Sequence, residues 1–134
     1  MFKPSRVAAM LPAQDLERAK AFYRDKLGLT PSQDMGEGGA LYLLASGGGF
    51  VLYVSGGKPS GTHTQLAFEV QDVEQAANDL KTKGVRLEEY DTPTLKTVNG
   101  IADIGGFKGA WFKDSEGNLI ALAPPMPVAA TSRS

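Results

Sequence analysis

The chain repeats itself, and this internal repeat constrains its fold more than any other feature of the sequence. Residues 14–19 read QDLERA, and residues 71–76 read QDVEQA. Aligning them superimposes the wider stretches 7–28 and 64–85, and such self-similarity indicates two copies of one structural unit. The alternative is a chance similarity between two amphipathic helices. The two stretches share identical residues at Gln14/Gln71, Asp15/Asp72, Glu17/Glu74, Ala19/Ala76 and Lys26/Lys83.

Each copy of the repeat predicts a strand that leads into a helix. The apolar runs before Asp15 and before Asp72 are typical of strands. Both aspartates stand where a side chain can accept a hydrogen bond from the first free N–H groups of a helix. Apolar residues then recur at helical spacing, and we expect Gly28 and Gly84 to end the two helices.

Strand-like segments follow both predicted helices. In the first copy, residues 40–45 (ALYLLA) and 50–55 (FVLYVS) flank SGGG, a pattern that predicts a hairpin. In the second copy, residues 109–114 (GAWFKD) and 118–123 (NLIALA) flank SEG in the same way. The fold class is therefore α+β, with a helix on one side of each sheet.

The remaining segments give weaker signals. Less regular strands are expected at 29–35 and 86–92, and they complete a βαβββ pattern in each copy. The glycine-rich stretches 55–64 and 97–110 are expected to be loops, and the second of them is a candidate lid. The end of the chain, 124–134, is rich in proline and then in small polar residues, so we expect a flexible tail.

The length of the chain fits one domain. With 134 residues it can bury a core without disulfides or metal ions. We expect a single domain over residues 1–123, made of two modules at about 5–57 and 62–123.

Composition and charge exclude several kinds of chemistry. The chain contains no cysteine, which rules out disulfides, thiolate metal sites and cysteine nucleophiles. Its net charge of −1 gives no sign of binding to nucleic acid or to an anionic membrane. No stretch approaches the roughly 18 apolar residues of a membrane span. We therefore expect a cytoplasmic protein without nucleic-acid or membrane partners.

Three segments carry a resemblance to a known family. ERAKAFYRDKLGL (17–29), LAFEVQDVEQA (66–76) and WFKDSEGNLIALA (111–123) resemble the vicinal oxygen chelate superfamily. Its members include glyoxalase I, extradiol dioxygenases, fosfomycin-inactivating enzymes and bleomycin-binding resistance proteins. The resemblance covers roughly residues 5–123. It implies two βαβββ modules whose curved mixed sheets surround a shared cavity, and it says little about the reaction.

The resemblance also implies where a metal ion would be held. In the metalloenzymes of the superfamily, four side chains bind a divalent ion, one from the first and one from the last strand of each module. The corresponding positions here are Ala8, Tyr53, Gln65 and Ala121. Alanine offers no donor atom, and a protonated tyrosine or a lone glutamine is a poor ligand. We therefore expect no metal ion and no other cofactor.

A substitute metal site would have to use other residues. Strand alternation places His63, Gln65 and Glu69 on one face of the first strand of the second copy. His63 is the only histidine of the chain, and a polar residue at the end of a strand is the competing interpretation. Three donors along one strand would surround an ion poorly, so the expectation of a metal-free protein stands.

Aromatic residues are the remaining signal for a binding site. If Tyr53 faces the cavity, the hairpin is expected to place Tyr42 opposite it. Met10 lies on the same side of the first strand as Ala8. In the second copy, alternation directs Trp111 toward the concave face. The alternative is that these side chains fill a solid interior. The residues expected to bind the ligand are Met10, Tyr42, Tyr53, Gln65, Trp111 and Ala121, with Gln65 as the polar anchor.

Three functions remain open. The first is a metal-free protein that binds a planar, largely apolar small molecule, with a possible role in sequestration or resistance. The second is a divalent-metal-dependent enzyme of glyoxalase or dioxygenase type with atypical ligands. The third is metal-independent lyase or isomerase chemistry that uses Tyr53, His63 or Gln65. The resemblance also implies a homodimer.

Overall fold

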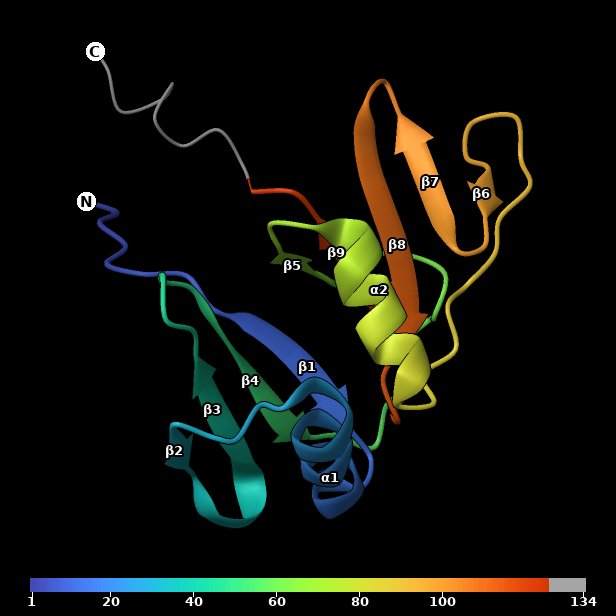
Figure 1. Ribbon diagram of the computed structural model, residues 1–134. Helices are drawn as coiled ribbons and strands as arrows, with labels where there is room; N and C mark the ends of the chain where they lie inside the picture. The colour runs from blue at the N-terminus through green and yellow to red at the C-terminus, as the bar shows by residue number, and fades with distance from the viewer. Residues whose placement is uncertain (126–134) are drawn as a thin grey trace. The chain divides into compact units, whose positions relative to one another are not determined.

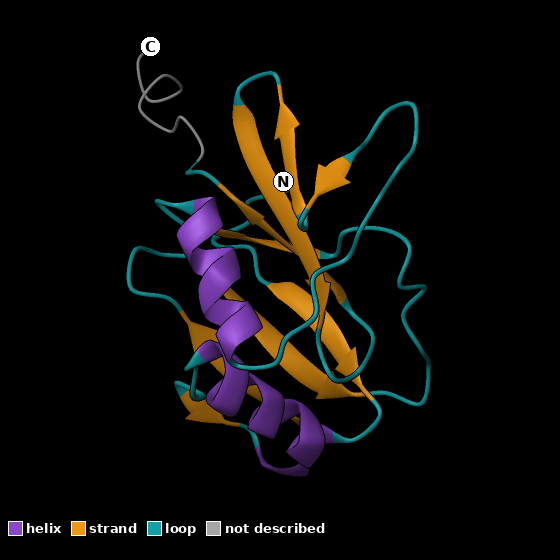
Figure 2. Ribbon diagram, turned by 45° about the vertical axis from the view of Figure 1, so that its right-hand side comes forward, coloured by secondary structure: helices purple, strands orange, loops and turns teal. Residues whose placement is uncertain are grey.

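The computed structural model describes residues 1–125, and the chain divides into two compact units. The first unit contains Met1–Leu66 and Lys113–Leu119, and the second contains Ala67–Phe112 and the described residues from Ile120 onward. Figure 1 labels the elements, and Figure 2 colours them by type. A short segment near the end of the chain thus belongs with the unit built mainly from its first half.

The first unit is a four-stranded mixed sheet with one helix. Its strands lie in the order β1-β4-β3-β2, with β1 parallel to β4 and the other neighbours antiparallel. This arrangement confirms the predicted strand, helix and three strands, including the hairpin. The elements are β1 (Ala9–Ala13), α1 (Leu16–Leu27), β2 (Gln33–Asp34), the 3-10 turn η1 (Gly36–Gly38), β3 (Gly39–Leu43) and β4 (Gly49–Val54).

Helix α1 begins and ends where the sequence predicts. The Asp15 side chain accepts a hydrogen bond from the backbone N–H of Arg18 at 3.0 Å. Gly28 adopts a left-handed conformation with a φ of 71°, which ends the helix at little steric cost. Ala19 and Tyr23 belong to the buried stripe of the helix. These local signals are strong because they depend only on neighbouring residues.

The core of the first unit is an aromatic cluster beneath α1. Tyr42 and Phe50 stack with ring centroids 4.7 Å apart, and Tyr23 lies 5.4 Å from Phe50. Leu11 and Leu52 complete the fully buried set on the neighbouring strands. Aromatic pairs at these distances contribute about 0.5–1.5 kcal/mol beyond the burial of their surface.

The second unit contributes a five-stranded sheet and the second helix. The strands lie in the order β5-β9-β8-β7-β6. The predicted hairpin of β8 and β9 is confirmed, but the sheet has one strand more than the βαβββ pattern. The elements are β5 (Leu66–Glu69), α2 (Val73–Thr82), β6 (Thr97–Val98), β7 (Ile101–Ile104), β8 (Phe107–Lys113) and β9 (Leu119–Ala123).

Helix α2 repeats the features of α1. The Asp72 side chain accepts a hydrogen bond from the backbone N–H of Gln75 at 3.0 Å, in the same geometry as Asp15 in α1. Val73, Ala77 and Leu80 form its buried stripe at helical spacing. The two matching caps support the interpretation of the repeat as two copies of one unit.

The glycine-rich segment 97–110 is not a loop, so that prediction is wrong. It forms β6, β7 and the start of β8, and the turns between them are Asn99-Gly100 and Gly105-Gly106. All four turn residues have positive φ, which is the geometry of type I′ hairpin turns. The glycines therefore serve a tightly connected sheet.

Neither of the two less regular strands forms as expected. The predicted strand at 29–35 is reduced to the two residues of β2. In place of a strand at 86–92, Leu87 forms an isolated bridge with Phe112, and Asp91 forms one with Lys96. Pairing with β8 thus begins at Leu87 but does not continue.

Two expectations concern the ends and the environment of the chain. The expected flexible tail lies, from residue 126, outside the described residues. Neither helix in the described part of the chain has the length and apolar character needed to cross a membrane.

Candidate functional site

One face of the first sheet carries apolar side chains that α1 does not cover. Strand alternation buries Leu11, Phe50 and Leu52 on the helix side and turns their neighbours to the other face. There Met10 pairs with Val51, and Met10 is 53% exposed. The residues Met10, Leu41, Leu43, Val51 and Tyr53 are called the first open face.

Tyr42 does not belong to this face. It pairs across the hairpin with Phe50, whereas Tyr53 pairs with Gly39. Tyr42 is 1% exposed and lies in the aromatic cluster beneath α1. Its expected position opposite Tyr53 is therefore wrong, because the loop of residues 44–48 sets a register that the sequence pattern does not reveal.

The first open face does not fit a metal ion. Ala8 precedes the first pair of β1 and β4, Ala9 with Phe50, whereas Tyr53 lies opposite Pro12. The two mapped positions are thus four residues apart along the strands, or about 13 Å. Gly49 and Val51, which lie nearer to Ala8 on β4, carry no donor atoms. No group of three or more metal-ligating side chains occurs among residues 1–125.

Trp111 lies on the face of the second sheet that α2 does not cover. Its neighbour Phe112 is fully buried, and Lys108 on the same side as Phe112 forms an ion pair with Glu74 of α2 at 3.9 Å. Trp111 is half-buried and meets the ring of Tyr90 edge-on, with centroids 5.7 Å apart. Trp111 therefore presents an indole on the side of the sheet that faces away from the helix.

The surroundings of Trp111 leave room for its ring. A side chain at Gly109 would come within 3.2 Å of the indole, so the absence of one lets the ring lie along its own strand.

The other neighbours of Trp111 offer little polar chemistry. Burial raises the pKa of the Tyr90 phenol, whose ring contacts Trp111. The expected site residue Ala121, on the neighbouring strand β9, is 7% exposed and offers little surface to a ligand.

The three alternative metal donors do not form a site. His63 lies in the loop before β5 and is exposed, and its Nδ1 is 2.7 Å from the Ser60 hydroxyl. Gln65 is half-buried, and its side-chain oxygen Oε1 is buried without a hydrogen-bond partner. Glu69 is exposed at the end of β5. The Gln65 backbone N–H still donates to the carbonyl of Leu119 on β9, whereas His63 lies in the loop, so the strand alternation that grouped these residues does not extend to His63.

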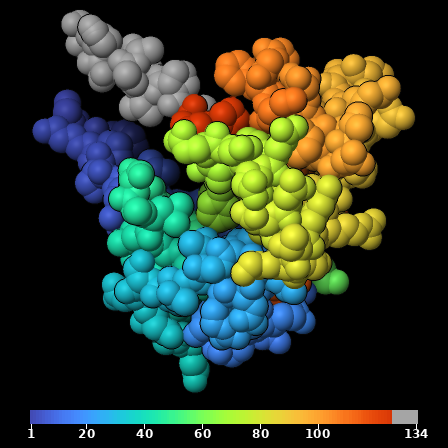
Figure 3. Space-filling model, viewed as in Figure 1, coloured from blue at the N-terminus to red at the C-terminus, as the bar shows by residue number. Residues whose placement is uncertain are grey.

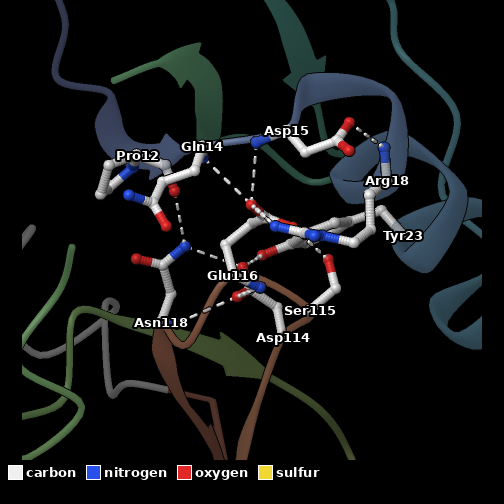
Figure 4. A network of polar contacts seen from close by, with 9 residues as sticks. All are labelled: Pro12, Gln14, Asp15, Arg18, Tyr23, Asp114, Ser115, Glu116 and Asn118. Atoms are coloured by element: carbon white, nitrogen blue, oxygen red, sulfur yellow. Dashed lines mark hydrogen bonds and ion pairs between the residues drawn. The ribbon is translucent and has the colours of Figure 1, made fainter. Parts of the chain in front are cut away.

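The most polar cluster of the first unit is structural. In the turn after β8, one Asp114 oxygen, Oδ1, accepts the backbone N–H of Glu116 and of Asn118, and the other, Oδ2, accepts the Tyr23 hydroxyl at 2.7 Å. The Asn118 side chain donates to the carbonyl of Pro12. Figure 4 shows this network, which joins the turn to α1 and β1.

Glu116 extends the network to the start of α1. Its oxygen Oε1 accepts the backbone N–H groups of Gln14 and Asp15, and both oxygens bind the Arg18 guanidinium, with Nε 2.8 Å from Oε2. Burial alone would raise the pKa of Glu116, but hydrogen bonds from Arg18, Ser115 and Asp15 lower it to about 2. Sequence reasoning missed this role of Glu116.

A cleft of about 820 Å³ lies on the helix side of the second unit. Its lysines are already paired: the Lys81 ammonium donates to the carbonyl of Asn99, and Lys108 lies 3.4 Å from Asp103. Lys96 is paired with Asp91 at 3.6 Å. Each lysine that lines the cleft therefore already has a hydrogen-bond or ion-pair partner. The lining residues are Glu74, Asn78, Lys81, Lys96, Val98, Asn99, Ile101, Asp103 and Lys108.

A smaller recess of about 280 Å³ lies at the hairpin end of the first open face. Most of its lining is apolar or glycine, and its one charged member is Arg6. The lining residues are Arg6, Val7, Ala8, Leu41, Leu43, Leu44, Ala45, Gly47, Gly48 and Gly49.

Comparison with known proteins identifies relatives of this architecture. Residues 6–122 match the model of the family described as Glyoxalase/Bleomycin resistance protein/Dioxygenase superfamily. No curated protein matches the chain.

Solved structures show the same fold at low sequence identity. The crystal structure of UcmS2 matches with a TM-score of 0.71 and 21% identity, covering 92% of this chain and 100% of that one. The fosfomycin resistance protein FosX from Listeria monocytogenes gives a TM-score of 0.67 at 16% identity, with coverages of 95% and 98%. Lactoylglutathione lyase from Agrobacterium tumefaciens gives 0.64 at 18% identity, with coverages of 92% and 96%.

Proposed function

Because residues 6–122 show that the chain belongs to the Glyoxalase/Bleomycin resistance protein/Dioxygenase superfamily, we propose that it binds a planar, largely apolar small molecule without a metal ion. The observation that carries the proposal is Trp111, a half-buried indole on a sheet face that its own helix does not cover. An aromatic ring in this setting offers a broad apolar surface for stacking.

The donor chemistry supports a metal-free mode of binding. Tyr53 and Gln65 are the only mapped ligand positions that carry a side-chain oxygen, and neither is a strong ligand for a divalent ion. Of the functions in the superfamily, binding without catalysis is the one that does not need Tyr53 or Gln65 to act as a metal ligand. Sequestration of a harmful small molecule is a role that such binding would fill.

Fluorescence titration tests the proposal directly. Trp111 is the only tryptophan of the chain, so its emission has a single indole source. We expect at least one compound from a panel of planar aromatic metabolites and antibiotics to shift this emission in the wild type. Calorimetry should then show that Trp111→Ala weakens binding of that compound about tenfold or more, while Trp111→Phe retains most of the affinity.

Thermal unfolding of the two variants separates binding from folding. Trp111→Ala should remain folded, since the side chain is only half-buried. If a ligand binds tightly while the emission stays fixed and Trp111→Ala merely lowers the Tm, the proposal is wrong. Binding that requires added zinc, nickel, iron or manganese would favour the metalloenzyme alternative.

We also propose a homodimer. Each sheet has one face covered by its own helix and one face that is not, and Met10 and Leu43 on the first open face are 53% and 46% exposed. Exposed apolar side chains clustered on one face favour association with another protein surface. A second copy of the chain is the partner that the family resemblance suggests.

A further inference from the structure

We propose that the recess at the hairpin end of the first open face binds a small molecule that combines an apolar body with one anionic group, such as a carboxylate. The proposal uses only residues of the first unit. It is therefore independent of the stacking on Trp111 proposed above. Figure 3 shows the N-terminal segment, in dark blue, beside the end of the β3–β4 hairpin, in green.

The recess exists because small residues surround it. Ala8 contributes only a methyl group, and three consecutive glycines, 47–49, contribute no side chains. A Cβ at Gly49 would lie 3.0 Å from the side chain of Leu43 and 2.7 Å from the carbonyl of Tyr42. A side chain at position 49 would therefore not fit, and the glycines of the hairpin leave a space that leucine side chains and Arg6 border.

The walls of the recess are aliphatic. Leu41, Leu43 and Leu44 supply them, so the body of a ligand would be held mainly by burial of apolar surface. A volume of about 280 Å³ is near the lower limit of ligand pockets, which suits a molecule of one or two rings or a short branched chain.

Arg6 gives the recess its charge preference. It is the single charged residue of the lining, and no acidic residue accompanies it there. No side chain of residues 1–125 forms an ion pair or hydrogen bond with Arg6. A guanidinium binds a carboxylate through two parallel hydrogen bonds, which makes a monoanion the matching ligand.

A pair of isosteric probes tests this assignment. We would measure the binding of 2-naphthoate and of the neutral 2-naphthamide to the full chain by calorimetry. Because the two probes share a shape, the ratio of their affinities isolates the contribution of the negative charge. We expect 2-naphthoate to bind about five- to tenfold more tightly in the wild type, with the preference decreasing as salt is added.

Two charge variants test whether the preference for 2-naphthoate over 2-naphthamide comes from Arg6. Arg6→Gln should bring the ratio of the two affinities close to one. Lys3→Gln removes an equal charge from the same segment but does not line the recess, so it should leave the ratio unchanged. An equal loss in both variants would show a general effect of charge and would overturn the proposal.

A volume variant and a tryptophan variant complete the test. Ala8→Leu fills the recess at an exposed position and should weaken both probes without lowering the Tm. Trp111→Ala should leave the affinity ratio intact. If Trp111→Ala removes the binding of 2-naphthoate while Arg6→Gln does not, the recess proposal is overturned and the proposed function is supported. Failure of 2-naphthoate to bind at millimolar concentration also overturns the recess proposal.

Discussion

At the scale of single residues, Glu116 shows how hydrogen bonds and an ion pair can surround a buried charged side chain. Its side chain is 1% exposed, yet each oxygen accepts hydrogen bonds from charged or polar donors. The backbone N–H groups at the start of a helix favour a negative charge there. Glu116 therefore completes the capping of α1 that Asp15 begins.

Replacing Glu116 by glutamine tests this role. Glu116→Gln keeps the shape but removes the charge and places an amide group beside Arg18, so we expect a loss of about 2 kcal/mol in the free energy of unfolding. Urea denaturation measures the loss. Glu17→Gln, at an 82% exposed carboxylate on the same helix, should change stability by less than about 0.5 kcal/mol. Equal effects would show that burial of Glu116 is unimportant.

The same residue predicts an acid-sensitive stability. The pKa of Glu116 falls from its ordinary value of 4.5 to about 2 in the folded chain. A lowered pKa contributes stability that is complete above about pH 4.5 and is lost as the pH falls toward 2, up to roughly 3 kcal/mol in total. The stability difference between wild type and Glu116→Gln should shrink over this range. A difference independent of pH would contradict the assignment.

At the scale of elements, the two I′ turns of the second sheet have similar backbones but different surroundings. Gly100 and Gly106 each occupy the second turn position, with φ of 80° and 94°. A Cβ at Gly100 would come within 2.5 Å of the Leu87 side chain, whereas one at Gly106 would meet nothing within 4 Å. The Asn99-Gly100 turn thus packs against Leu87, whereas no atom lies close to the Cβ position of Gly106.

These turns form a matched pair for mutation. Gly106→Ala should cost about 1 kcal/mol, because only the positive φ opposes the new side chain. Gly100→Ala should cost at least about 2 kcal/mol, since the same strain is joined by a clash with Leu87. Thermal unfolding compares the two variants. Equal losses would mean that Leu87 moves away freely.

Elements also show what the sequence could and could not predict. The caps at Asp15 and Asp72 and the β3–β4 hairpin depend on local residue patterns, and these predictions are confirmed. Register is not local. The position of Tyr42 was predicted wrongly for that reason, and segment 97–110 was mistaken for a loop because turn glycines and loop glycines look alike in sequence.

The candidate site was harder to predict than the fold. Trp111 and Phe112 lie on opposite faces of β8, as predicted, because strand alternation is a short-range rule. Glu116 and Arg6 were missed, since their roles depend on segments far apart in the chain. Arg6 matters only through a recess formed with residues 41–49, and Glu116 only through the start of α1.

At the scale of the whole molecule, we predict that the chain forms a homodimer. Sedimentation at micromolar concentration should show two chains per particle. Met10→Asp places a charge on the first open face and should weaken association, whereas Val98→Asp, at a 68% exposed position of the second unit, should not. A wild-type monomer over the full concentration range would contradict the proposal.

The second whole-molecule prediction concerns metal ions. A chelator should leave the Tm unchanged, because the mapped ligand positions lack strong donors. Zinc or nickel in saturating excess should likewise add less than about 2 kcal/mol of stability, as expected when no specific site exists. A larger, stoichiometric stabilisation that disappears in His63→Ala or Gln65→Ala would show that a site was overlooked.

The turn between β8 and β9 packs against α1 and β1, although it is synthesised much later than they are. On the ribosome, Pro12 and Tyr23 emerge long before their partners, which lie 106 and 91 residues further along. The nascent first half therefore leaves the exit tunnel before Asp114, which accepts the Tyr23 hydroxyl in the folded chain, and before Glu116, which binds the start of α1. The first unit can therefore be completed only after residues 113–119 have been synthesised, although most of its residues precede the whole of α2 and β6–β8 in the chain.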